Sequence, residues 1–307
     1  MVEDIGKIIN NGIETYTKNL NLGIPFALNV IITSLLAIII LGFGFLNIFG
    51  PSLSTLENTT TPQEVLLIII PMVISHLAQI IILLITFFLI SLAIESFFTA
   101  GAIGMARQAT ETGKSELTTM VEAGKKNVVN LFLADVLVGL LSLAGIVFIV
   151  PGALKFDINQ LLFPEKNGAP FLLIAGIFLW VLYLLILGLV FAVFRYALVV
   201  DNLEPIEGIT TGFNFFKKNK SDVFVLWLIL GIIIVAISII GELMRFSPVM
   251  NLIWPLVNVF INVFVVAPLT TVFWVRLYMT RTGKEVYFND LLLHPNDLAK
   301  LKSEQET

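Results

Sequence analysis

The sequence predicts an all-α integral membrane protein with six transmembrane helices, arranged as three repeated helical hairpins, each preceded by an amphipathic interfacial helix. Composition is the first observation: 57% of the 307 residues are hydrophobic and only 13% are charged, against roughly 25% charged residues in soluble domains. The second is the absence of charge from six long runs, and the third is a polar motif that occurs three times. The uncharged runs are 19–56, 65–94, 136–154, 167–194, 223–241 and 246–275.

These runs have the length of membrane spans, because a helix needs about 20 apolar residues to cross roughly 30 Å of hydrocarbon. A water-soluble protein would have to bury six helices that are apolar on every side, and too little sequence remains to cover them. Glu3, Asp4 and Glu14 precede a first run that is too long for a cleavable signal, so we expect it to be retained. The expected spans are approximately 22–48, 66–100, 129–153, 170–196, 222–243 and 252–278.

The second span poses a problem of length. From Leu66 to Arg107 the only strongly polar residues are His76 and Glu95, and one helix over this segment would measure about 60 Å. It must therefore protrude, tilt strongly or break. Proline and glycine are the usual causes of a break, which makes Pro71 and the glycines at 101 and 104 the expected positions.

The spans are expected to pair as antiparallel hairpins. Proline or glycine marks the far end of each odd-numbered span, at Gly50-Pro51, Pro151-Gly152 and Ser247-Pro248, and the connections that follow are short. Span 1 should therefore pack with span 2, span 3 with span 4, and span 5 with span 6.

An internal repeat introduces the odd-numbered spans. Lys18-Asn19, Lys126-Asn127 and Lys218-Asn219 each precede a span and follow a segment with apolar residues at helical spacing. Such a helix beside a span is expected to lie in the membrane interface. Each even-numbered span closes with an arginine, at Arg107, Arg195 and Arg276.

The predicted repeats cover residues of about 2–107, 115–196 and 203–278, within a single membrane domain that ends in a cytoplasmic tail at 279–307. All three units run in the same direction, so the repeat axis is expected to lie near the membrane normal.

The distribution of Lys and Arg predicts the orientation. All but three of the eighteen fall on one side of the predicted spans, and the exceptions are Lys155, Lys166 and Arg245. The positive-inside rule places the rich side in the cytoplasm. We therefore expect a multi-pass protein of the cell membrane with both termini cytoplasmic.

The run FRYALVVDNLEPIEGITTGFNFFKKN resembles the segment that joins two hairpins in a group of multi-pass prokaryotic proteins. These are similar to the membrane domain attached to some glycerophosphoryl diester phosphodiesterases, and many archaeal members stand alone with unknown function. In that group an acidic residue follows the arginine-ended span, a place taken here by Asp201, Glu204 and Glu207. The chain has no room for a soluble phosphodiesterase domain, so the resemblance implies the fold and not the enzymatic activity.

No catalytic or cofactor motif stands out. Gly113-Lys114-Ser115 is like the end of a phosphate-binding loop, but Gln108 stands where that motif requires glycine. His76 and His294 are on separate elements and are too few to bind zinc. There is no cysteine, so disulfides and thiolate metal sites are excluded. We expect a protein that is not an enzyme and binds no cofactor or metal.

Two acids inside the predicted spans are candidate functional residues. Glu95 lies about 18 Å from Arg107 along a helix, and Asp135 lies about 12 Å beyond Asn127. Such residues usually face a bundle interior or a water-filled cavity. One interpretation is a proton or cation site, with Asn29, Asn258 and Asn262 contributed by neighbouring spans. The alternative is a pair of neutral, hydrogen-bonded acids that fix helix packing.

The basic residues at the cytoplasmic boundary are a second candidate site. Arg107, Arg195 and Arg276, with Lys18, Lys126 and Lys218 nearby, would form a three-fold ring suited to lipid phosphates. The alternative is ordinary snorkelling of cationic side chains at the ends of spans.

These patterns favour a non-enzymatic membrane protein whose interfacial helices contact anionic lipid or a membrane-protein partner, which includes a second copy of the chain. A transporter or permease that uses Glu95 and Asp135 is the competing interpretation. A third, an accessory subunit of a lipid-metabolising enzyme, follows from the family resemblance alone. We expect no nucleic-acid partner.

Overall fold

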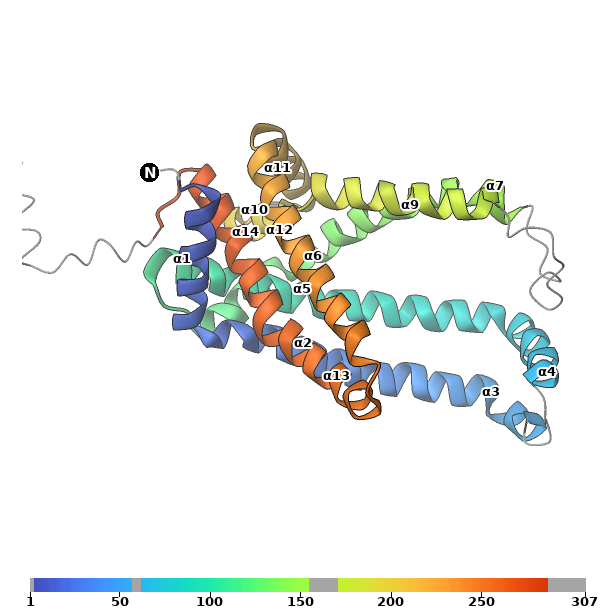
Figure 1. The fold of residues 1–307 in the computed structure, drawn as a ribbon. Coiled ribbons are helices and arrows are strands. Elements are labelled where there is room, and N and C mark those ends of the chain that lie inside the picture. The colour runs from blue at the N-terminus through green and yellow to red at the C-terminus, as the bar shows by residue number, and fades with distance from the viewer. Residues whose placement is uncertain (1–2, 57–61, 155–170, 287–307) are drawn as a thin grey trace, which may run out of the picture.

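A computed structural model describes residues 3–56, 62–154 and 171–286, and every regular element within these ranges is helical (Figure 1). Six helices are long and apolar enough to cross a membrane, which makes the protein a multi-pass helical membrane protein. These candidate spans are Leu20–Gly50, Leu77–Thr112, Leu117–Phe148, Phe171–Asp201, Lys220–Met244 and Pro248–Arg281. His294 and the tail beyond residue 286 lie outside the described residues.

The spans are built from α-helices joined by short 3₁₀ and π turns. In hydrocarbon every backbone N–H and C=O must be paired within the protein, and a helix achieves this within one segment. The elements are α1 (Ile5–Lys18), η1 (Leu20–Gly23), α2 (Ile24–Ala37), η2 (Ile38–Gly42), α3 (Phe43–Leu56), α4 (Pro62–Ser75), α5 (Leu77–Thr112), α6 (Leu117–Ala144), η3 (Gly145–Phe148), α7 (Val150–Ala153), α9 (Phe171–Val190), α10 (Phe194–Asp201), α11 (Pro205–Lys218), α12 (Lys220–Met244), α13 (Pro248–Ile261), η4 (Asn262–Val266) and α14 (Ala267–Arg281).

The break in the second span lies at a different residue from the expected ones. The helix runs through Pro71 and through both glycines, and it is interrupted at His76 between α4 and α5. The glycines at 101 and 104 instead allow α6 to approach closely, because added Cβ atoms there would overlap Met120 and Ala123. They are packing positions and not hinges.

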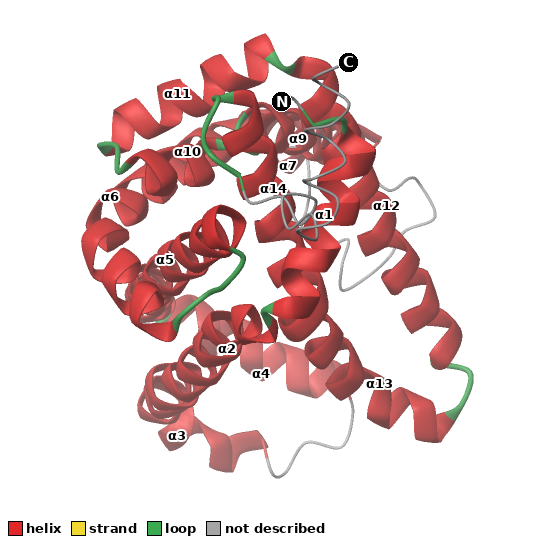
Figure 2. Cartoon of the chain, turned by 90° about the vertical axis from the view of Figure 1, so that its left-hand side faces the viewer, coloured by secondary structure: helices red, strands yellow, loops and turns green. Residues whose placement is uncertain are grey.

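The three hairpins converge at one end of the molecule and diverge at the other (Figure 1). At the convergent end, α1, α10, α11 and α14 gather beside α5 and α6 (Figure 2). The core lies here: the whole stretch 271–280 of α14 is buried, together with Met105 and Ala106 of α5 and Leu198 of α10.

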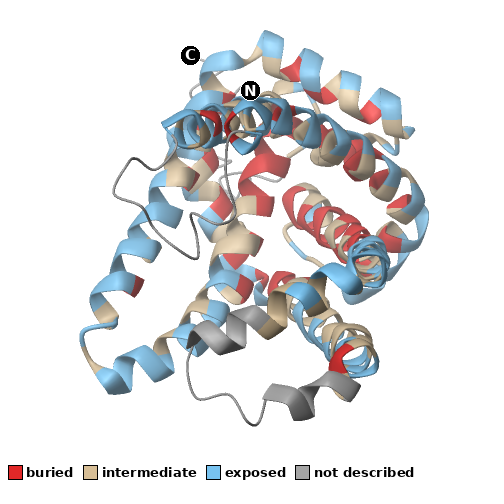
Figure 3. Cartoon of the chain, turned by 90° about the vertical axis from the view of Figure 1, so that its right-hand side faces the viewer, coloured by how far each residue is buried: buried red, intermediate tan, exposed pale blue. Residues whose placement is uncertain are grey.

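The divergent ends of the hairpins expose large apolar side chains. Ile82 is 66% exposed, Phe178 68% and Leu256 74%, and exposed residues cover the outer faces of the hairpins in Figure 3. This distribution is the reverse of that in a soluble protein, and it fits a surface surrounded by lipid chains.

The helices that precede the odd-numbered spans pack on the ends of the even-numbered ones. α1 lies against α14, with Gly12 facing Phe273, and α11 lies against α10, with Gly212 facing Phe194. The corresponding segment of the second unit packs on α5 but is continuous with its span, because α6 is one helix from Leu117 to Ala144. Each of these helices therefore contacts the preceding hairpin, and α1 contacts the last one.

A buried ion pair joins the residues just before α1 to α14. Arg276 donates from Nε to Glu3 Oε2 and from Nη2 to Glu3 Oε1, both at 2.7 Å, and both side chains are only 2% exposed. Asn11 donates to the same carboxylate, and Arg281 donates to the backbone carbonyl of Glu3. The N-terminal residues are thus anchored to the last span.

Candidate functional site: a charged cluster between two hairpins

The structure brings the two predicted intramembrane acids together and adds an arginine to them. Glu95 of α5 and Asp135 of α6 both meet Arg195 of α10. Arg195 Nε donates to Asp135 Oδ1 at 2.7 Å, and its Nη1 lies 3.4 Å from Glu95 Oε1. Three elements and two predicted hairpins therefore contribute to one cluster, which we call the acid–arginine cluster.

Arg195 follows a short break in the helix. α9 ends at Val190 and α10 begins at Phe194, and in the turn at 191–193 two backbone hydrogen bonds are 3.4 Å long, those from Ala192 to Leu189 and from Phe194 to Phe191. α10 packs on both α5 and α6, and this brings Arg195 to the acids that they carry. The prediction that Arg195 simply marks the end of a span missed this, because the helix continues to Asp201.

The three side chains are not equally accessible. The Asp135 side chain is 3% exposed, and its Oδ2 lies 3.4 Å from the hydroxyl of Ser96, which is itself buried. Arg195 and Glu95 are 37% and 43% exposed. Asp135 is thus the buried counter-ion that fixes the guanidinium, while Arg195 and Glu95 present an accessible positive and an accessible negative group.

A crevice of about 460 Å³ lies between the first two hairpins and ends at two members of the acid–arginine cluster, while Glu95 does not line it and lies beside it in contact with Arg195. Asp135 and Arg195 line the polar end. The walls are largely apolar and include Phe88, Leu92, Val138, Leu184, Leu187 and Phe191. A crevice with a charged end and apolar walls has the polarity of an amphiphilic molecule.

The three predicted asparagines do not join this cluster. Asn29 on α2 accepts a long hydrogen bond from Thr33, at 3.4 Å. Asn258 and Asn262 line a separate pocket between α12 and α13. The prediction of a five-residue polar site is therefore wrong for its three asparagines. The structure joins Glu95 and Asp135 with Arg195, which had been assigned to the basic ring.

The three arginines that were expected to end the even-numbered spans occupy three different environments. Arg107 pairs with Glu111 at 2.7 Å and donates to the carbonyl of Val200 at 2.8 Å. Arg195 belongs to the acid–arginine cluster, and Arg276 is buried against Glu3. The expectation of a ring open to lipid phosphates is thus wrong for Arg276, because its buried guanidinium has no surface to offer.

The lysines of the predicted ring differ in the same way. Lys18 pairs with Glu14 at 2.8 Å, whereas Lys126 and Lys218 are exposed and form no ion pair within the described residues.

The asparagines that follow these lysines form the same hydrogen bond in all three places. The side chains of Asn19, Asn127 and Asn219 each donate to the backbone carbonyl four residues earlier, at 2.9, 3.1 and 3.1 Å.

A second feature recurs at the ends of the even-numbered spans. In the described part of the chain, the residues with positive φ are Gly113, Asn202 and Gly283, at 81°, 53° and 72°. Each follows the helix that carries one of the three arginines, where a left-handed residue commonly caps the last turn. Gly113 and Gly283 occupy the same place in two similar segments, 110–114 and 280–284.

The Gly113-Lys114-Ser115 segment has a structural explanation. Asn19 accepts from the backbone N–H of Ser115 at 2.8 Å and donates to the carbonyl of Gly113 at 3.0 Å. Asn21 accepts from the Ser115 hydroxyl at 2.7 Å. These bonds tie the loop after α5 to the turn between α1 and α2, and they leave no phosphate-binding loop.

Sequence reasoning missed a second polar network at the convergent end. Asp201 accepts from the hydroxyl of Tyr278 at 2.6 Å and pairs with Lys284 at 2.5 Å, and Arg281 pairs with Asp222 at 2.6 Å. These bonds join residues 59 to 83 positions apart in the chain. The available signal was the acidic residue that follows the arginine-ended span in the resembling group, which is Asp201 here, but the sequence does not name its partners Tyr278 and Lys284.

Comparison with known proteins gives one informative similarity. No protein-family model and no solved structure matches the chain. An uncharacterized protein of Archaeoglobus fulgidus is 28% identical over 195 residues, which is 62% of this chain and 65% of that relative's length. At this identity the chain is similar to an archaeal protein of unknown function, and no family membership follows from it.

Proposed function

We propose that the protein binds a zwitterionic phospholipid in the crevice between its first two hairpins and acts as a lipid-binding membrane protein without enzymatic activity. The supporting observation is the crevice itself, which has Asp135 and Arg195 at one end and apolar walls along its length. Lipid chains would lie along Phe88, Leu184 and Leu187, and the head group would meet Arg195 at the end of the crevice and Glu95 beside it.

The balance of charge selects the head group. With all three groups ionised, the acid–arginine cluster carries one more negative than positive charge, so a purely anionic head group would be repelled. Asp135 already holds the Nε of Arg195 at 2.7 Å, whereas the contact of Arg195 with Glu95 is loose at 3.4 Å. A phosphate on the accessible guanidinium and an ammonium on Glu95 would satisfy both groups with charge-assisted hydrogen bonds.

The same contacts argue against cation transport through this site. A transported cation would need the carboxylates of Glu95 and Asp135 as ligands, and the Arg195 guanidinium already occupies the position between them. Arginine does not lose its proton in proteins, so it would remain a competitor for these carboxylates.

The test compares two lipids with identical chains, dioleoyl-phosphatidylethanolamine and dioleoyl-phosphatidylglycerol, added to the purified protein in detergent. Binding is measured by native mass spectrometry and by the shift in thermal unfolding. We expect tighter binding of the ethanolamine lipid, and we expect Glu95→Gln to remove that preference, about tenfold in Kd for one charge-assisted hydrogen bond. Glu122→Gln is the matched control, because Glu122 is exposed on α6 and, unlike Glu95, forms no ion pair with Arg195.

Equal binding of both lipids by the native protein would contradict the proposal, and so would an unchanged preference in Glu95→Gln. Arg195→Gln is expected to weaken binding of both lipids, but it also leaves the buried Asp135 carboxylate without its Arg195 partner. The Glu95 variant is therefore the decisive one, because it removes an accessible group and keeps the pair of Arg195 with Asp135.

We also propose that the chain contains three copies of one unit in the cell membrane, with the convergent end in the cytoplasm. The recurring asparagine hydrogen bonds and left-handed capping residues support the repeat. Exposed lysines such as Lys126 and Lys218 at the convergent end favour contact with an anionic membrane surface. Such a protein could serve a lipid-metabolising enzyme as an accessory subunit, which is the role implied by the family resemblance.

Single cysteines test the orientation cleanly, because the chain has none of its own. Cysteines in place of Lys126 and Lys218 should react with a membrane-impermeant maleimide only from the cytoplasmic side, and a cysteine in place of Ser247 only from the other. Labelling of residues 126 and 218 from opposite sides would refute both the orientation and the repeat.

A further inference from the structure

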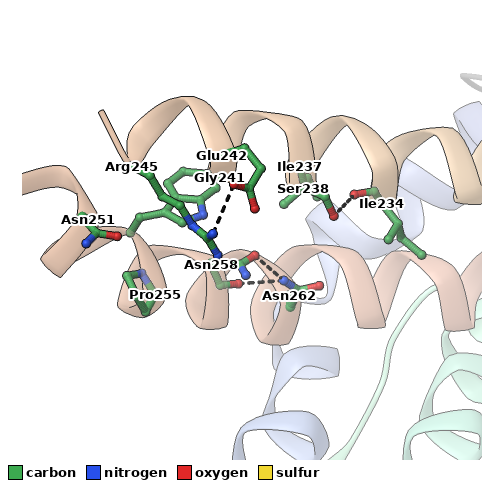
Figure 4. A pocket seen from close by; sticks show the side chains of 11 residues that line it. Ile234, Ile237, Ser238, Gly241, Glu242, Arg245, Asn251, Pro255, Asn258 and Asn262 are labelled. Carbon is green, nitrogen blue, oxygen red and sulfur yellow. Dashed lines mark hydrogen bonds and ion pairs between the residues drawn. The ribbon is translucent and has the colours of Figure 1, made fainter. Parts of the chain in front are cut away.

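A polar pocket lies within the third hairpin, between α12 and α13, and is separate from the acid–arginine cluster (Figure 4). It has a volume of about 380 Å³. Polar residues at helical spacing face each other across it: Ser238 and Glu242 on α12 with Arg245 just after its end, and Asn251, Asn258 and Asn262 on the opposite side.

The pocket extends to membrane depth. Asn258 and Asn262 follow Pro248, the first residue of α13, by ten and fourteen positions, which corresponds to about 15 and 21 Å along a helix. Uncompensated polar groups at this depth are costly in lipid and normally face a partner or a polar cavity. Asn262 donates to Asn258 Oδ1 at 2.7 Å, which leaves the Asn258 amide N–H groups and the Asn262 amide oxygen directed at no described residue.

The backbone of the pocket wall is irregular at two places. Pro255 lies inside α13, and without an N–H it cannot pair with the carbonyl of Asn251. A π turn begins at Asn262, and such turns often occur at functional sites. Irregular backbone at membrane depth is tolerated where it is buried or lines a polar cavity, so both irregularities fit a pocket that holds a hydrogen-bonding ligand.

Charge in the pocket is balanced and confined to its mouth. Glu242 and Arg245 pair at 3.2 Å near the turn between the helices, and their side chains are 67% and 69% exposed. The deeper part is lined by the hydroxyl of Ser238 and the amides of Asn258 and Asn262, which are uncharged and offer both donors and acceptors. An ion would lack a counter-charge there, whereas hydroxyl groups could both donate and accept.

We infer that this pocket binds an uncharged polyhydroxylated group, the sugar or polyol portion of a membrane lipid or a free sugar. The mouth adds a guanidinium and a carboxylate that can each hold adjacent hydroxyls. Trp254 supplies an aromatic wall, which Gly241 makes possible: an added Cβ at Gly241 would lie 2.6 Å from the indole nitrogen.

The test uses the full chain in phosphatidylcholine nanodiscs and two probes with the same chains, monogalactosyl-dioleoylglycerol and dioleoylglycerol. Methyl galactoside, added in water, separates a free sugar from a lipid head group. We expect the galactolipid to bind at least about tenfold more tightly than the diglyceride, and Asn258→Leu to remove this difference by deleting the deep amide. Asn214→Leu is the control, because Asn214 is exposed on α11 outside the pocket.

Asn251→Ala at the mouth is a second variant, expected to weaken galactolipid binding while leaving the deep amides in place. Binding of methyl galactoside to the native protein, lost in Asn258→Leu, would support the inference and identify a soluble ligand. Equal binding of galactolipid and diglyceride would overturn it, as would a difference that survives in Asn258→Leu. Disulfide cross-linking of two chains through Asn251→Cys would also overturn it, because a second copy would then close the pocket.

Discussion

Replacing Glu3 by alanine is the most direct test of how the fold is held together. The change removes both 2.7 Å hydrogen bonds from Arg276 and the one from Asn11. It removes the Glu3 carboxylate from a guanidinium that is 2% exposed, and breaking such a buried pair costs about 3–5 kcal/mol. Lys18→Ala breaks the half-exposed pair with Glu14, which is worth only about 0.3–0.5 kcal/mol.

The assay is equilibrium unfolding of the purified protein in mixed micelles with increasing sodium dodecyl sulfate, followed by far-UV circular dichroism. A double variant, Glu3→Ala with Arg276→Met, separates loss of the pair from loss of packing, since it removes the buried positive charge as well. We expect the double variant to be more stable than Glu3→Ala alone. A loss below about 1 kcal/mol in Glu3→Ala, or strictly additive losses in the double variant, would refute the reasoning.

Three further predictions concern packing, capping and the loop after α5. Gly212→Leu should reduce the yield of monodisperse protein on size exclusion, because even a Cβ there would lie 2.5 Å from the Phe194 Cα. Asn202→Ala should lower the free energy of unfolding by about 1–2 kcal/mol, whereas Asn202→Gly should be tolerated, because φ at this residue is 53°. Asn19→Ala should speed tryptic cleavage after Lys114 about tenfold, because roughly 1.4 kcal/mol of hydrogen bonding to this loop is lost; an unchanged cleavage rate would contradict it.

The spans could be predicted from the sequence because their length and apolarity are local properties. Their boundaries were less predictable where a helix leaves the lipid and enters the protein core. The second and fourth spans were expected to end near residues 100 and 196, and they continue to Thr112 and Asp201. The extra turns are buried in protein at the convergent end, so the polar residues within them do not mark the end of the helix.

The acid–arginine cluster could be predicted only in part. The two acids stood out because each interrupts an apolar run. Their partner did not, because Arg195 is 60 and 100 residues away from them and an arginine at the end of a span usually snorkels to the interface. Only the turn at 191–193 and the packing of one hairpin on another bring it between them.

The bond between Glu3 and Arg276 also constrains biosynthesis. The two residues are 273 positions apart, so at about 5–20 residues per second a ribosome needs roughly 14–55 s to deliver the second after the first. Throughout that time α1 lacks α14, the helix on which it packs with Gly12 facing Phe273. The nascent first helix must wait on the membrane surface, and deletion of the last hairpin should leave it open to early degradation.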